Sequence, residues 1–374
     1  MRLNNHLFIL LSIGLHNEVD NPVILDVNWD DLIKLALKHG VAGQVFYGVK
    51  RLKENNVPNG RVEIDVLDFG HLFTITNRLE NSFISMWDKT VRLANLFYEN
   101  NIRTIVIKGF GIAALYPNSK ARNSCDLDCY LLPKVDSEIM LSIENDINDN
   151  KVVWEQANKI IEQKGINVKR SIYLHSVFNY DGLLVENHRY FTNVKGNRKM
   201  REFESYLHTL IKKNGLKTFP NTNIEVPTIL FTALYVLYHS HKHMLYGEMT
   251  LKMICDWAVI LKECSNRKFE WDEFWSVCQK YGLYRFAVAI TGLTENICNA
   301  PVPKDFKHDF LAEDTLYKFV MNPVAEVKHY SWKWLARLNH LYFTIKSRDK
   351  FIAFSDISST RAAWDIIKGR IYED

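Results

Sequence analysis

Two aspartates near the middle of the chain have a spacing that suits metal chemistry. Asp126 and Asp128 flank Leu127 within the run 125–132, whose apolar residues predict a strand. Because side chains at i and i+2 of a strand point to one face, we expect the two carboxylates side by side, with Leu127 on the opposite face. Two like charges so close are unfavourable unless a cation neutralises them, and hard oxygen ligands suit Mg²⁺.

A third carboxylate follows the same logic. Glu186 and His188 alternate on a second predicted strand, 183–189, and share one of its faces. If this strand lies beside the Asp126 strand, three carboxylates converge. Such a cluster can hold two Mg²⁺ ions roughly 3.5–4 Å apart for an in-line displacement at phosphorus. One ion would activate the attacking oxygen, and the other would carry the nucleotide phosphates and the leaving pyrophosphate.

The junction at Lys108-Gly109 supplies what phosphates require. It joins a predicted β-branched strand, 102–107, to a predicted short helix, 109–116. Gly109 permits close approach of the backbone, and the amides that open a helix point toward an anion. Lys108 or Arg122 would add a cation for charge that develops in the transition state. The expected nucleotide-binding residues are Lys108, Gly109, Phe110, Gly111 and His188, and the expected catalytic residues are Asp126, Asp128, Glu186 and Arg122.

The elements that must position these residues form an α+β pattern. Apolar residues recur every three or four positions over 65–100, which predicts a long helix before the first strand. Asp181-Gly182 between two strand-like runs, 171–180 and 183–189, predicts a tight type I′ hairpin. The sequence therefore predicts a small mixed sheet with helical regions on both sides: a helical region 1–100, an α/β core 101–195, a helical domain 196–305 and a helical extension 306–374.

Composition excludes several classes of protein. The chain has 374 residues, 47% of them hydrophobic and 24% charged, as in ordinary globular proteins and unlike disordered ones. Its net charge of +4 gives no indication of specific DNA binding or of an anionic membrane as partner. Six dispersed cysteines without a CxxC pair favour a reducing compartment. The nine-residue apolar run 7–15 is too short to span a bilayer, so we expect a cytoplasmic protein whose cysteines are small buried side chains.

The order of these motifs resembles a known family. The segment 106–133, VIKGFGIAALYPNSKARNSCDLDCYLLP, is similar to the signature of the uncharacterised nucleotidyltransferases of the DNA polymerase β-like superfamily. That signature is carried here by Lys108, Gly109, Ala113, Tyr116, Pro117, Arg122, Asp126 and Asp128. The later VENHRYF (185–191) resembles the strand of that family that holds the third carboxylate, and the resemblance covers about 25–305.

The resemblance implies a reaction class and no acceptor. It implies transfer of a nucleoside monophosphate from a nucleoside triphosphate, with ATP as the expected donor, to a small molecule, sugar, protein hydroxyl or tRNA end, with release of pyrophosphate. Asp126, Asp128 and Glu186 would bind two Mg²⁺ ions. The alternative is a catalytically weak nucleotide-binding or interaction protein on the same fold. The presence of all three carboxylates favours the enzyme.

Two further features stay open at this stage. His239 and His243 lie at i, i+4 of a predicted helix, and Asp256 lies on the next one. We favour a structural role in which both histidines pair with Asp256, over a substrate or phosphate contact and, last, a metal site. The basic run 188–201 is either a solvated loop or a grip on a triphosphate or nucleic acid. His175, on the preceding strand, is expected to pack or to support its neighbours and not to act as a base.

Overall fold

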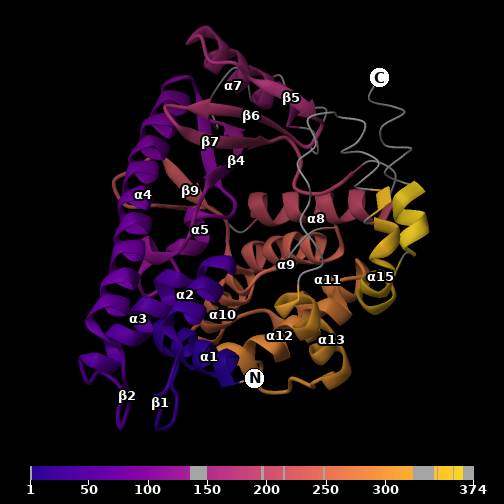
Figure 1. Cartoon of the computed structure of the whole chain (residues 1–374). Coiled ribbons are helices and arrows are strands. Elements are labelled where there is room, and N and C mark those ends of the chain that lie inside the picture. The colour runs from indigo at the N-terminus through magenta and orange to yellow at the C-terminus, as the bar shows by residue number, and fades with distance from the viewer. Residues whose placement is uncertain are drawn as a thin grey trace. The chain divides into compact units, whose positions relative to one another are not determined.

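The chain divides into two compact units, which we describe separately. The structure is a computed structural model, and it describes residues 2–134, 150–194, 198–213, 215–246, 249–322, 341–342, 344–356 and 358–364. One unit is Gly70–Thr232, and the other combines Met1–Phe69 with Ala233–Asp374. Figure 1 shows the mixed α+β architecture, with helices toward both ends of the chain, which confirms the predicted fold class.

The unit Gly70–Thr232 is built on a mixed sheet. In the described part of the chain this sheet has seven strands, in the order β5-β6-β7-β4-β3-β9-β8. The long helix α4, which starts just before this unit, runs along the sheet in Figure 1. The elements are α4 (Val66–Glu99), β3 (Ile102–Val106), α5 (Phe110–Ala113), η1 (Ser119–Ala121), β4 (Asp126–Pro133), α7 (Lys151–Gln163), β5 (Lys169–Ile172), β6 (His175–Tyr180), β7 (Leu183–His188), α8 (Arg198–Lys213), β8 (Lys217–Thr218) and β9 (Ile224–Val226).

The strands that carry the predicted carboxylates are neighbours. β4 and β7 pair in parallel, and their register sets Asp128 opposite Glu186. β7 also pairs antiparallel with β6, and β4 pairs antiparallel with β3. The condition on which the shared carboxylate site depended, that the Glu186 strand lie beside the Asp126 strand, is therefore met.

One face of this sheet forms the core of the unit. Leu127 of β4 and Val185 of β7 are buried against Phe97 of α4 and Ala157 of α7. Because side chains alternate along a strand, burial of Leu127 turns both of its neighbours to the opposite face. Burial of Leu127 thus determines that Asp126 and Asp128 lie on the face of the sheet opposite the core.

A polar cluster on the core side holds β7 against α7. Asn187 is fully buried and donates through Nδ2 to Asn158 Oδ1 at 3.1 Å, and Ser176 Oγ donates to the same oxygen at 2.7 Å. Trp154 Nε1 donates to the backbone carbonyl of Asn187 at 2.8 Å. The bond from Nδ2 satisfies one half of an amide that lies at a core position between Glu186 and His188, whereas Asn187 Oδ1 is buried without a hydrogen-bond partner among the described residues.

The second unit is largely helical. A two-stranded parallel pair, β1 with β2, joins the helices near its start. Among the described residues, no helix of the chain is long and apolar enough to cross a membrane. The elements are α1 (Arg2–Gly14), β1 (Val23–Ile24), α2 (Trp29–Lys38), α3 (Ala42–Lys53), β2 (Arg61–Val62), α9 (Ile229–Tyr246, which begins at the end of the first unit), α10 (Leu251–Ser265), α11 (Trp271–Lys280), α12 (Tyr284–Cys298), α13 (Phe310–Met321) and α15 (Arg348–Phe354).

Several expectations differ from the structure in detail. The helical domain expected over 196–305 also contains two short strands, β8 and β9, which extend the sheet. Strands of two and three residues are too short to show an alternating pattern. The run predicted as one strand over 171–180 belongs to two strands, β5 and β6. The polar, amphipathic run 136–163 also predicts a helix. Residues 136–149 lie outside the described residues, and α7 accounts for the rest.

The type I′ turn at the tip of the β6–β7 hairpin gives a direct test of the fold. Both of its central residues have positive φ, 53° at Asp181 and 83° at Gly182, as predicted. We expect Gly182→Ala to lower the free energy of unfolding by about 1–2 kcal/mol, because a side chain is disfavoured in this conformation. The matched control is Gly70→Ala in α4, where a Cβ meets nothing within 4 Å and should add about 0.5–1 kcal/mol of stability. Urea denaturation measures both, and equal effects of the two changes would contradict the assigned turn.

Candidate active site

The centre of the site is the buried carboxylate of Asp128. Its side chain is 1% exposed, and its Oδ1 lies 2.9 Å from Lys108 Nζ and 3.0 Å from His188 Nε2. Lys108 comes from the segment that follows β3, and His188 ends β7, so the strands on both sides of β4 supply the two cations. Asp128 is thus neutralised by side chains of the protein itself, where the sequence suggested a metal ion.

The charges at this centre stabilise one another. Burial alone would raise the pKa of Asp128, but the Lys108 ammonium and the hydrogen bond from His188 outweigh it and lower that pKa. Burial alone would lower the pKa of Lys108 and of His188. The carboxylates outweigh burial at both groups. Asp128 makes the largest contribution to raising the pKa of Lys108, and Asp126 and Glu186 add smaller ones. Hydrogen bonds to Asp128 and Glu186 raise the pKa of His188. All three predicted carboxylates therefore act on Lys108.

Glu186 faces two imidazoles from the same face of the sheet. Its Oε2 lies 3.6 Å from His188 Nε2 and 3.9 Å from His175 Nε2, and the bond to His188 lowers its pKa. His175 was expected only to pack or to support its neighbours, but the structure places it in this cluster. The signal was present in the sequence: a two-residue turn at 181–182 pairs position 180 with 183, and hence His175 with His188.

The predicted phosphate junction has the expected turn but a shorter helix. Gly109 caps α5 with φ 60° and ψ −105°, a conformation that favours glycine, although an added Cβ would meet only the Asp126 carbonyl oxygen at 3.6 Å. α5 is four residues long, where eight were expected. The Phe110 side chain is buried against Phe83 of α4, so only its backbone is available to a ligand. Gly111 lies close to the backbone of β3, which gives it a packing role.

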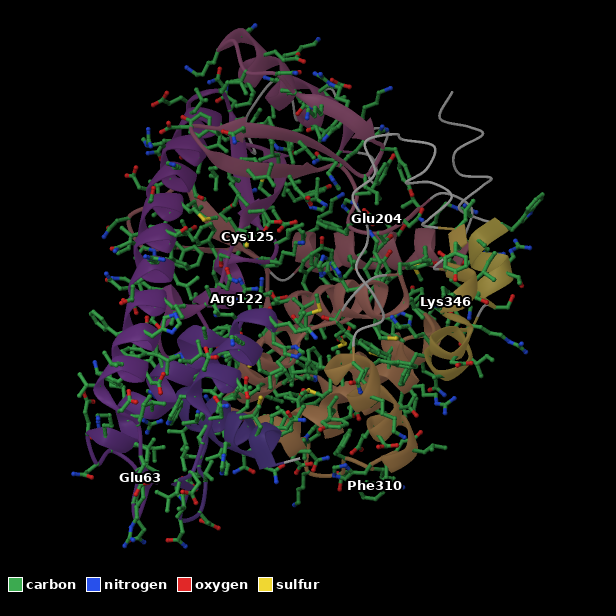
Figure 2. The ribbon with its side chains drawn as sticks, viewed as in Figure 1. Glu63, Arg122, Cys125, Glu204, Phe310 and Lys346 are labelled. Carbon is green, nitrogen blue, oxygen red and sulfur yellow. The ribbon has the colours of Figure 1, made fainter. Side chains whose placement is uncertain are left out.

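Arg122 lies in the loop that leads from η1 into β4. It is 5% exposed, and its Nη1 donates to Ser124 Oγ at 2.9 Å. Figure 2 labels Arg122 and Cys125, which lies on the same loop. Cys125 is exposed, contrary to the expectation of a buried side chain, because it precedes the first paired residue of β4. Cys129 lies inside the strand and is fully buried, and burial raises the pKa of its thiol.

A buried glutamate of α8 holds the chain that leaves β7. Glu204, labelled in Figure 2, accepts from the backbone amides of Phe191 at 3.0 Å and Thr192 at 2.7 Å. Its Oε1 also lies 3.1 Å from His208 Nε2, and Tyr130 of β4 completes the network at His208 Nδ1. This network fixes the segment directly after His188. The sequence analysis missed Glu204, because nothing in the polar pattern of α8 distinguishes it.

Comparison with known proteins identifies the family of this chain. The model of a family described as uncharacterised nucleotidyltransferase matches residues 26–139 and 147–299. The chain belongs to this family. Neither the curated proteins nor the solved structures contain a match. The family membership confirms the resemblance seen in the sequence and supports nucleotidyl transfer as the general activity.

The histidine pair of this family member lies in its other unit. The rings of His239 and His243 on α9 lie 4.5 Å apart, and Asp256 is buried on α10. His241 between them binds the Phe354 carbonyl oxygen through Nε2 at 2.7 Å, and burial lowers its pKa to about 4. Their structural role stays a prediction. In the basic run 188–201, residues 195–197 lie outside the described residues.

The charged state of His188 makes stability depend on pH. Its pKa in the folded chain is raised above the ordinary 6.5, so its contribution is complete below that value and is lost as pH rises through the folded pKa. We expect the melting temperature of the metal-free wild type to fall over this window, and His188→Gln to remove most of that fall. His71→Gln, at an exposed histidine of α4, is the matched control. A pH dependence unchanged by His188→Gln would show that His188 is neutral in the folded protein.

Proposed function

We propose that this protein is a Mg²⁺-dependent nucleotidyltransferase that moves a nucleoside monophosphate from a nucleoside triphosphate to an acceptor hydroxyl. The bond that forms joins the acceptor oxygen to the α-phosphorus, the bond that breaks releases pyrophosphate, and the acceptor gives up a proton. The observation that carries the proposal is the pairing of Asp128 with Glu186 on parallel neighbouring strands, with Asp126 two residues along the same face. Family membership supports the same reaction class.

The residues present fit a divalent cation. Asp128 Oδ2 is buried without a hydrogen-bond partner among the described residues, although Oδ1 has two. A buried carboxylate oxygen left in this state is costly unless a ligand reaches it. Asp126, Asp128 and Glu186 would hold two Mg²⁺ ions, which when bound would neutralise phosphate charge and promote ionisation of the acceptor hydroxyl. The acidic oxygen donors suit Mg²⁺.

The other groups of the site have assigned tasks in this proposal. Lys108 and His188 hold Asp128 in place and bring positive charge to the side where the triphosphate would bind. The backbone at Gly109, Phe110 and Gly111 would line the phosphates. Glu186 is assigned to cation binding and not to proton abstraction, because its lowered pKa makes it a weak base.

The second candidate is a protein on the same fold that binds nucleotide with little or no turnover. Release of pyrophosphate from labelled triphosphates, measured against pools of small molecules, sugars, proteins and tRNA, separates the two. Nucleotide binding without pyrophosphate release from any pool would favour the second candidate. The same screen identifies the preferred triphosphate, for which we propose ATP, and the acceptor class.

Asp126→Asn tests the carboxylate site with the least damage to the fold. Asp126 is partly exposed, whereas Asp128→Asn would leave two buried cations without their partner, at a cost of about 3–5 kcal/mol. We expect Asp126→Asn to lower pyrophosphate release by about 10²-fold or more and to abolish the rise in melting temperature caused by Mg·ATP. The matched control is Asp181→Asn, the same change at an exposed hairpin position. Equal activity of Asp126→Asn and wild type would exclude Asp126 from the site.

Arg122→Ala tests whether this side chain acts in the transition state. If its positive charge stabilises the departing pyrophosphate, we expect turnover to fall by about 10²-fold with little change in ATP affinity. Ser124→Ala removes the hydrogen-bond partner of Arg122 while keeping its charge. Turnover, ATP affinity and melting temperature are measured for both variants. Parallel losses of turnover and stability in the two would show that Arg122 only braces the loop before β4.

A further inference from the structure

Two histidines and one glutamate meet on the outer face of the β6–β7 hairpin. His175 pairs directly opposite His188 across the antiparallel strands, and Glu186 lies two residues before His188 on the same face. One ligand atom from each of the three side chains lies within 4.8 Å of the others, and in the described part of the chain no other histidine, cysteine, aspartate or glutamate group of this size has such geometry. The strand register alone therefore assembles a three-donor set.

We propose that His175, Glu186 and His188 bind a transition-metal ion, with Zn²⁺ as the closest match. Two imidazoles and one carboxylate, with a position left open, is a ligand set found in catalytic zinc sites. Imidazole suits zinc and its first-row neighbours, whereas Mg²⁺ takes oxygen ligands. This site goes beyond the proposed nucleotidyl transfer, since it needs no nucleotide and two of its three donors are imidazoles; it shares only Glu186 with the proposed Mg²⁺ site.

The three donors must move closer together to share one ion, because their ligand atoms lie within 4.8 Å of one another. Glu186 Oε2 lies 3.6 Å from His188 Nε2 and 3.9 Å from His175 Nε2. In a tetrahedral site with metal bonds of about 2.0–2.1 Å, neighbouring donors lie roughly 3.3 Å apart. His175 and Glu186 are 14% and 26% exposed, which gives their side chains room to rotate toward the buried His188.

A second observation concerns the other nitrogen of His188. Its Nδ1 lies 3.4 Å from the backbone carbonyl oxygen of Tyr190. A carbonyl oxygen can only accept, so this contact favours a proton on Nδ1. His188 Nε2 lies 3.0 Å from Asp128 Oδ1 and faces Glu186, so a metal ion at this atom must displace the proton that Nε2 shares with Asp128. Metal-binding histidines usually have such a partner on the second nitrogen. Glu204 supports this arrangement, because it fixes the backbone directly after Tyr190.

Glu186 can serve this site and the proposed Mg²⁺ site together. It faces both imidazoles with the same oxygen, Oε2, so neither of these two contacts uses Oε1. The competing reading is that the trio is only an ion pair, in which a proton on His188 Nε2 occupies the place of the metal. The two readings differ in whether an ion displaces that proton.

Titration of the nucleotide-free protein with Co²⁺, a coloured substitute for Zn²⁺, tests the proposal. We expect one Co²⁺ per chain with the strong visible absorption of a four- or five-coordinate ion, bleached by Zn²⁺ and unaffected by excess Mg²⁺. His175→Gln should weaken Co²⁺ binding by about 10²-fold or more, because one of three protein ligands is lost. His71→Gln, at an exposed histidine, and His243→Gln, at the histidine pair of α9, should leave it unchanged.

The outcomes distinguish this site from the rest of the molecule. Binding that survives His175→Gln, is lost in His243→Gln or is displaced equally well by Mg²⁺ would overturn the proposal. Asp126→Asn should abolish the response to Mg·ATP and retain the Co²⁺ spectrum, so failure of the proposed function and failure of this site are separable. If His175→Gln does not fold, imidazole NMR signals of the wild type decide: addition of Zn²⁺ must shift those of His175 and His188 but not that of His71.

Discussion

The buried charge of Asp128 is the constraint on which the site depends. A carboxylate that is 1% exposed is costly unless cations and hydrogen bonds surround it, and here Lys108 and His188 do so at 2.9 and 3.0 Å. Each of these partners requires a particular strand pairing. Lys108 reaches Asp128 because β3 pairs with β4, and His188 reaches it because β7 pairs with β4 on the other edge. The pairing of the three central strands, β3, β4 and β7, therefore determines the electrostatics of the site.

This arrangement changes what a metal ion would contribute. Close carboxylates suggested that a divalent cation is needed to hold them together, but the protein supplies its own positive charge. The raised pKa values of Lys108 and His188 favour their protonated forms, and these two cations offset two of the three carboxylates. On the proposed function, a site with so little excess charge gains most of its affinity for Mg²⁺ when the triphosphate is bound, because the phosphates add the missing anionic ligands.

Much of this fold could be predicted from local patterns. The long helix α4, the strands β3 and β4 and the hairpin turn at Asp181-Gly182 each have a signal contained within a few residues: helical periodicity, a β-branched run, or a turn that requires positive φ. The same alternation placed Asp128 and Glu186 on faces opposite the core. In contrast, β9 joins the sheet by pairing with β3, a contact between residues more than a hundred positions apart that leaves no local pattern, and β8 then pairs with β9.

The site was predictable to the level of residues but not of their contacts. Lys108 was assigned to phosphate, yet its ammonium lies on Asp128, because the parallel pairing of β4 with β7 and the burial that follows from it are not visible in one segment. His175 shows the opposite case. A two-residue turn at 181–182 places residue 180 opposite residue 183. Counting back five residues on one strand and forward five on the other then places His175 opposite His188. Register within a hairpin follows from its turn, so the position of His175 opposite His188 could have been predicted. Register between distant strands requires the folded structure, so the contact of Lys108 with Asp128 could not have been predicted.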